Sequence, residues 1–155
     1  MQSARIASIY CDANKKLIGI PHAKGDLQNY ILSDIFFELE PSYSNKELGL
    51  FIDKLFEVYD NATPALEGIT AMQKYTGLEA YAEAIKEYHL VTVTQEINKS
   101  FTFRPMLVDK KQEDSFTDIK GLSVKAQIYN KFVPVSSDSK ALAFKVAMDI
   151  IAEQG

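Results

Sequence analysis

The chain has a single cysteine, no tryptophan and only two histidines. A lone thiol, Cys11, cannot form a disulfide within the chain, and such cysteine usage is typical of a reducing compartment. No cysteine pair or cysteine–histidine cluster has the spacing of a zinc site. We therefore expect no disulfide, no metal and no cofactor, and we interpret Cys11 as a small residue within a strand.

Long apolar runs and a basic surplus are also missing. No window approaches the ~18 apolar residues of a transmembrane helix. The N-terminal sequence MQSARIASIY lacks the apolar stretch of a signal peptide. The 17 Lys and Arg against 21 Asp and Glu give a net charge of −4, which argues against a general nucleic-acid binder. These features predict a cytoplasmic protein that binds neither membranes nor nucleic acid.

The composition is that of an ordinary globular protein. Hydrophobic residues make up 46% of the 155 residues and charged residues 25%. A chain of this length can bury a sizeable core without disulfides or metals. We expect one domain that spans residues 1–155.

The first third of the sequence reads as strands. Two short apolar runs, 5–11 and 17–20, flank residues 12–16, and the Asp and Asn there suit a tight turn. This pattern predicts a β-hairpin. A third strand is expected over 30–39, because its end alternates between apolar and acidic residues.

Helices follow, and the first has a clear start. Ser44 with Glu47 three residues on is a capping-box pattern, and apolar residues at helical spacing continue to about Tyr59. Further helices are expected over 64–75 and 78–88. A last helix is expected from Ser137 or Asp138 to about Glu153, with Ala141, Phe144, Met148 and Ile151 facing inward.

The second half supplies more strands. We expect them over 91–96, 101–108, 122–129 and 131–135, with Val91, Val93, Phe101 and Phe103 on one face. Pro105 lacks an amide hydrogen, so the strand that holds it should lie at a sheet edge or bulge. We predict the α+β class: a mostly antiparallel sheet of five to seven strands, with three or four helices packed mainly on one face.

No motif in the sequence names a reaction. A nucleophile elbow, a P-loop, a dinucleotide fingerprint and an HExxH pair are all lacking. His22 and His89 are therefore expected to have structural or surface roles, and no residue is assigned as catalytic. The alternative is a small-ligand domain or an enzyme, which a pocket joining a histidine to a carboxylate and a hydroxyl would favour.

Acidic residues concentrate in one block. Residues 26–60 hold eight acidic residues against two lysines. On the first helix, Asp53, Glu57 and Asp60 are expected opposite the apolar stripe, with Leu50 among them and Phe56 at the boundary. An apolar anchor ringed by acids suits a basic protein partner, whereas the alternative is an ordinary solvated helix face.

A second candidate contact is the acidic loop 109–118. Glu113, Asp114 and Asp118 surround Phe116 there. The aromatic ring either contacts a partner or tucks into the core. A third candidate is the possible open sheet edge near Pro105, where a partner strand could add.

Two segments resemble a known family. FELEPSYSNKELGLFIDKLFEVYDNA and KFVPVSSDSKALAFKVAMDIIA are similar to the strand–Ser/Asp–helix blocks of CdiI-type immunity proteins of bacterial contact-dependent growth inhibition systems. The positions that carry the resemblance are Ser44, Glu47, Leu48, Gly49, Ile52 and Leu55, then Ser137, Asp138, Leu142 and Ala147.

The resemblance implies a cytoplasmic antitoxin without catalysis of its own. Such a protein binds the toxic C-terminal domain of a cognate CdiA effector, often a nuclease, and covers or distorts its active site. We expect a monomer or weak dimer with this one protein partner. The alternatives are the small-ligand domain or enzyme above and an adaptor that dimerises through a sheet edge.

Overall fold

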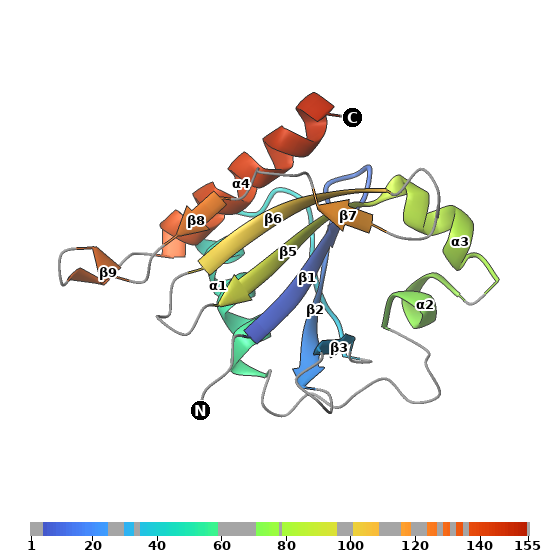
Figure 1. Cartoon of the computed structure of the whole chain (residues 1–155), viewed down its shortest axis with the longest axis horizontal. Helices are drawn as coiled ribbons and strands as arrows, with labels where there is room; N and C mark the ends of the chain where they lie inside the picture. Colours follow the sequence, from blue (N-terminus) through green and yellow to red (C-terminus); the bar gives the residue numbers. More distant parts are fainter. Residues whose placement is uncertain are drawn as a thin grey trace.

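A computed structural model gives the fold of the chain (Figure 1). The residues that it describes are 5–24, 30–32, 35–58, 71–77, 79–95, 101–108, 116–118, 124–126, 129–130, 133–134 and 137–154. Within these ranges the fold is an antiparallel sheet with helices against it, which confirms the predicted α+β class.

Four long strands form the centre of the sheet in the order β2-β1-β5-β6. They are β1 (Arg5–Cys11), β2 (Leu17–Lys24), β5 (His89–Gln95) and β6 (Phe101–Val108). Short strands extend both sides: β3 (Tyr30–Leu32) and β4 (Phe37–Leu39) pair with β2, and β7 (Phe116–Asp118) and β8 (Val124–Ala126) pair with β6. A separate pair joins β9 (Tyr129–Asn130) and β10 (Val133–Pro134).

The β1–β2 hairpin closes on the turn that the sequence predicts. The Asp12 carboxylate accepts hydrogen bonds from the backbone amides of Asn14 at 2.8 Å and Lys16 at 2.9 Å. Lys15 has a positive φ of 70°, which such a turn requires of one residue. Local side-chain chemistry therefore fixes the register in which Cys11 faces Leu17.

The two long helices are α1 (Asn45–Glu57) and α4 (Ser137–Gln154), and they pack side by side on one face of the sheet (Figure 1). The predicted capping box is confirmed at the start of α1. Ser44 Oγ accepts from the Glu47 amide at 3.1 Å, and the Glu47 carboxylate accepts from the Ser44 amide at 3.2 Å. These bonds satisfy two donors that the first turn would otherwise leave free.

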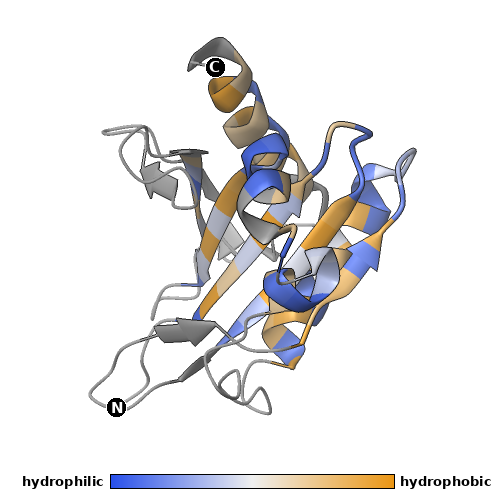
Figure 2. Cartoon of the chain, turned by 90° about the vertical axis from the view of Figure 1, so that its right-hand side faces the viewer, coloured by the Kyte–Doolittle hydropathy of each residue, from blue (hydrophilic) through white to orange (hydrophobic). Residues whose placement is uncertain are grey.

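The main core lies between this helix pair and the sheet. As predicted, Val91, Val93, Phe101 and Phe103 point to one face and are buried there. From α4 the buried residues include the predicted Ala141, Phe144 and Ile151, while Met148 packs on the cluster partly buried. Figure 2 shows apolar and polar residues alternating along the strands, the pattern expected when each strand contributes to both faces.

A smaller cluster occupies part of the other face. It joins Tyr10, Ile18, Ile20 and Leu90 of the sheet to Ala71 and Met72 of α2 (Ala71–Thr76). The helix α3 (Tyr81–Ala84) and a 3-10 turn, η4 (Ile85–Glu87), follow α2 within the predicted segment 78–88. Helices thus lie on both faces, with the two long ones together on one.

Neither proline of the central strands, Pro21 or Pro105, pairs with one of the described outer strands. The predicted strand 30–39 is divided into β3 and β4, which pair with β2 on either side of Ile20 and Pro21. Likewise β8 pairs with Phe101–Phe103 and β7 with Met106–Val108, so neither pairs with Pro105. β6 has neighbours on both sides, so the strand as a whole is not an edge strand. At Pro105 itself neither outer strand pairs with it, which agrees with the edge predicted at this residue.

Candidate functional site

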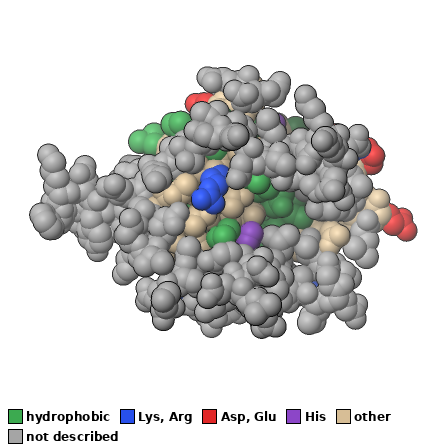
Figure 3. Space-filling view, viewed as in Figure 1, with side chains coloured by type: hydrophobic (Ala, Val, Ile, Leu, Met, Phe, Trp, Pro, Cys, Tyr) green, Lys and Arg blue, Asp and Glu red, His purple; other side chains and the backbone are tan. Residues whose placement is uncertain are grey.

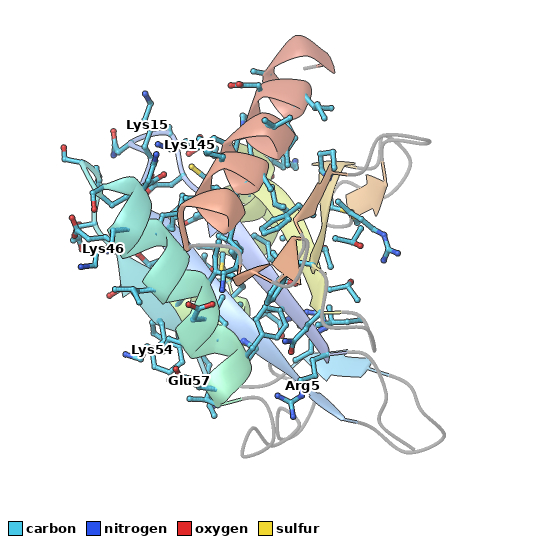
Figure 4. All side chains as sticks on the ribbon, turned by 90° about the vertical axis from the view of Figure 1, so that its left-hand side faces the viewer. Arg5, Lys15, Lys46, Lys54, Glu57 and Lys145 are labelled. Carbon is cyan, nitrogen blue, oxygen red and sulfur yellow. The ribbon has the colours of Figure 1, made fainter. Side chains whose placement is uncertain are left out.

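The outer face of α1 was one predicted contact surface, and its charge differs from the prediction. Leu50 is 52% exposed and Glu57 is exposed, as a partner site requires. Lys46 and Lys54 are exposed on the same helix (Figure 4). Asp53 forms an ion pair with Lys140 of α4. The described part of this face therefore balances its acids with lysines and is not an acidic ring.

Two further residues of this prediction have different positions. Phe56 is only 5% exposed and meets the Phe101 ring edge-to-face, with 5.3 Å between ring centroids. Its predicted place at the boundary is corrected to the core, because α1 contacts both the sheet and α4 and so buries a wider arc than one apolar stripe. Asp60 lies outside the described residues.

The second predicted surface is only partly described. Glu113 and Asp114 lie outside the described residues. Phe116 and Asp118 belong to strand β7, where they pair with Val108 and Met106 of β6. The end of the predicted loop is therefore a short strand at the side of the sheet.

Exposed apolar side chains mark the helix layer. Among the described residues, the large hydrophobic side chains that are exposed are Leu50 of α1 and Leu142 and Val146 of α4. Leu142 and Val146 are four residues apart and hence neighbours on one side of α4. Lys145 lies beside them in sequence and donates a hydrogen bond to Asn45 at the start of α1. The outer side of the helix pair thus combines apolar groups with lysines (Figure 4).

A group of polar residues on the other face of the sheet was not predicted as a site. We call these residues, Ser8, His22, Thr92, Thr94, Thr102 and Arg104, the polar strip. Directly opposite residues of paired strands share a face. Ser8 pairs with Thr92, Thr92 with Arg104, and Thr94 with Thr102, so these side chains leave the same face. Figure 3 shows a basic and a histidine side chain close together on the side of the molecule that faces the viewer of Figure 1.

The histidine of the polar strip is held in a neutral form. His22 Nε2 lies 2.7 Å from Ser8 Oγ and shares a hydrogen bond with it. Burial lowers the pKa of His22 to about 4, because the charged imidazolium loses its hydration. The other ring nitrogen, Nδ1, is buried and has no hydrogen-bond partner in the described structure.

Other titratable groups have structural explanations. Burial, helped by the charge of Asp12, raises the pKa of the Cys11 thiol to about 11, so the reactive thiolate is disfavoured. Lys16 lies 2.9 Å from Glu38 and 3.4 Å from Glu40. The hydrogen bond from Lys16 holds the pKa of Glu38 below its usual value. These carboxylates at the sheet surface are thus partners of one lysine.

Sequence reasoning missed the polar strip for an identifiable reason. The alternation in 91–96 and 101–108 does show that Thr92, Thr94, Thr102 and Arg104 share one face of two strands. These residues lie beside Ser8 and His22 only because β1 pairs with β5, a contact between distant parts of the chain. Among the described residues no group of three metal-ligating side chains is present, and no helix is long and apolar enough to cross a bilayer.

Comparisons with known proteins find structures with a similar fold. No protein-family model and no curated protein sequence matches the chain. A protein of unknown function from Neisseria meningitidis has a similar structure, with a TM-score of 0.73 at 14% identity over 97% of this chain and 96% of that chain. A chain of the CdiA-CT/CdiI toxin and immunity complex from Yersinia pseudotuberculosis has a TM-score of 0.66 at 9% identity over 96% and 97%. At these identities the likeness shows a related fold across nearly the whole chain.

Proposed function

We propose that the protein is an immunity protein that binds and neutralises the C-terminal toxin domain of a cognate CdiA effector in the cytoplasm. The observation that carries the proposal is the likeness to a chain of a CdiA-CT/CdiI complex, which extends over 96% of this chain. A likeness of this extent includes the sheet and both long helices, the elements that would present a binding surface. The proposal therefore assigns a protein partner.

The sequence resemblance supports the immunity role rather than the toxin role. The segments similar to CdiI-type proteins begin at Phe37 and Lys131, and they include α1 and most of α4, the helix pair over the main core. The raised pKa of Cys11 and the neutral state of His22 also suit a protein that acts by binding. We propose that it is not an enzyme and that the toxin is a nuclease.

The outer face of α1, which carries Leu50 and Glu57, is the surface that we propose for toxin contact. Leu50 offers an exposed apolar anchor, and affinity in protein interfaces comes mainly from such anchors once they are buried. Glu57 adds a negative charge that Lys46 and Lys54 offset on the same helix, so attraction to a basic nuclease would come from the net charge of −4 of the whole chain. Asp53 contributes less to this field, because Lys140 neutralises it.

Co-expression with the toxin domain encoded immediately upstream tests the function. We expect a stable one-to-one complex on co-purification and survival of cells that express the toxin together with this protein. The absence of a complex, together with the death of those cells, would exclude the immunity function. A complex without survival would exclude neutralisation alone.

Truncation of Leu50 tests the surface. Leu50→Ala should weaken toxin binding by about tenfold, the effect of removing a contact worth about 1.4 kcal/mol. The matched control is Leu142→Ala, which removes the same group from an equally exposed leucine on α4. Equal affinities of wild type and Leu50→Ala would show that the toxin does not use the α1 face.

A small-ligand domain is the second candidate. The hydrogen-bonded Ser8 and His22 within the polar strip favour it, because they bring an imidazole and hydroxyls to one face. A carboxylate to complete a proton-relay group is lacking among the described neighbours of His22, so binding is favoured over catalysis.

A further inference from the structure

Arg104 is the positive end of the polar strip. It is exposed, and no carboxylate in the described part of the chain forms an ion pair with it. Thr92 lies directly opposite Arg104 on β5, where side chains begin about 4.5–5.5 Å apart. Thr94 occupies the diagonal position, within reach of a long side chain. A guanidinium with hydroxyl neighbours is a donor-rich arrangement without its own acceptor.

Thr94 has an unused hydrogen-bonding group beneath this surface. Its residue is only 4% exposed, and its Oγ1 atom has no hydrogen-bond partner in the described structure. Buried hydroxyls are normally paired, and an unpaired one costs stability. A valine would fill the same volume without this cost. A threonine at this position is therefore best explained by a partner that is bound only at times.

The net charge of the polar strip sets the charge of that partner. Arg104 is cationic, whereas His22 stays neutral near pH 7 because burial lowers its pKa. One positive charge matches one negative charge. A planar monoanion also fits the two parallel N–H groups of a guanidinium.

We propose that Arg104, with the hydroxyls of Thr92 and Thr94, forms a binding site for a single carboxylate group. The guanidinium donates two hydrogen bonds to the carboxylate oxygens, and the half-buried Thr92 hydroxyl donates to them from one side. The Thr94 hydroxyl, buried in the unbound chain, joins them when the side chains that cover it move apart. The carboxylate belongs either to an acidic side chain of a protein partner or to a small free acid. The site lies on the opposite face of the sheet from α1 and goes beyond the proposed immunity function without depending on it.

Titration of the isotope-labelled protein with sodium acetate tests the chemistry, at constant ionic strength with chloride as the balancing anion. We expect the backbone amide resonances of residues 92, 94 and 104 to shift with a saturable, millimolar midpoint, a signal that every variant retains. Arg104→Gln should abolish saturable binding, and Thr94→Val should weaken it several-fold. Lys46→Gln removes an equal charge from α1 and should leave the titration unchanged.

Specific results of the same titration would contradict the proposed site. A shift that does not saturate, or one that persists with Arg104→Gln, would overturn the site. Binding of inorganic phosphate more tightly than acetate would overturn the assignment to a carboxylate. The amide spectrum of each variant verifies that it is folded, and the exposed position of Arg104 makes its replacement tolerable.

A second arm identifies the source of the carboxylate. If it is an acidic side chain of the toxin, Arg104→Gln should weaken the toxin complex at least about tenfold, because a charged hydrogen-bonded pair is lost. If acetate binds and the toxin complex is unaffected by Arg104→Gln, the source is a free acid. Because the acetate arm needs no toxin, failure of the site and failure of the immunity function give separate results.

Discussion

The two faces of the sheet are built from the same strands but differ in what they bury. On the face toward α1 and α4, Ile9, Val93 and Phe103 are fully buried among apolar neighbours. On the other face, the residues that alternate with them include Ser8, Thr94 and Thr102, which are equally buried but polar. Apolar burial stabilises the fold, whereas burial of hydroxyls stabilises it only when each one is paired.

The apolar face therefore contributes most of the stability, whereas the polar face carries the proposed binding site. Among the described residues, the side chains that the sheet buries on the first face are apolar, so this face is expected to tolerate little change. The second face includes two buried polar atoms without partners, Nδ1 of His22 and Oγ1 of Thr94. Such atoms reduce stability, and the proposed carboxylate site would supply a partner for Thr94 Oγ1.

The largest expected effect is on the apolar face. Phe103→Ala should lower the free energy of unfolding by about 3–5 kcal/mol, because the ring is fully buried and its loss leaves a cavity. Urea unfolding measures this loss, and Leu50→Ala, which truncates an exposed side chain, is the control. A loss below about 1 kcal/mol would mean that this face is not the main core.

The loss of stability at low pH should come from the polar face. The folded-state pKa of His22 is about 4 against 6.5 for a free histidine, so the unfolded chain binds the proton more tightly. Stability from this group is complete above pH 6.5 and is lost as the pH falls toward 4, by about 3 kcal/mol in total. Urea unfolding at several pH values measures it, and His22→Gln should remove this part of the slope. Replacement of the exposed His89 is the control and should leave the slope in place. An identical slope in His22→Gln would contradict the burial of a neutral His22.

Gly19 tests how closely helix and sheet approach on the apolar face. A Cβ atom at this position would lie 2.8 Å from Phe51 Cζ and 2.9 Å from Leu55 Cδ1 and Cδ2. These atoms are the ends of side chains that can shift, so Gly19→Ala should cost about 1–3 kcal/mol of unfolding free energy. An unchanged thermal midpoint would show that α1 lies further from β2.

The smallest effect should have the opposite sign. Thr94→Val replaces an unpaired buried hydroxyl with a methyl group and should raise the free energy of unfolding by about 1 kcal/mol. Ser8→Ala is the contrast, because it removes a hydroxyl that is bonded to His22 and should destabilise. If Thr94→Val destabilises the protein instead, Oγ1 has a partner in solution.

Local features of the fold were readable from the sequence, and long-range ones were not. The turn at Asp12 and the cap at Ser44 were predicted because each depends on residues within four positions. The ion pair of Asp53 was missed because Lys140 is 87 residues away. Burial of Phe56 followed from the packing of α4 on α1, which no pattern within α1 reveals.

The same distinction between local and long-range features applies to the candidate sites. Exposure of Leu50 and Glu57 followed from helical periodicity alone. The polar strip required the strand order β2-β1-β5-β6, in which the first hairpin meets a second pair of strands from the middle of the chain. Alternation within each strand predicts which residues share a face, but only the register of the paired strands places Arg104 opposite Thr92 and Thr92 opposite Ser8.

The proposed immunity function requires that this protein binds the toxin domain itself. Calorimetric titration of the purified chain with an inactivated form of the upstream-encoded toxin domain measures this binding. We expect a saturable one-to-one complex with an affinity that weakens as salt is added, as expected where opposite charges assist association. Absence of heat and of any complex at micromolar concentrations would contradict it.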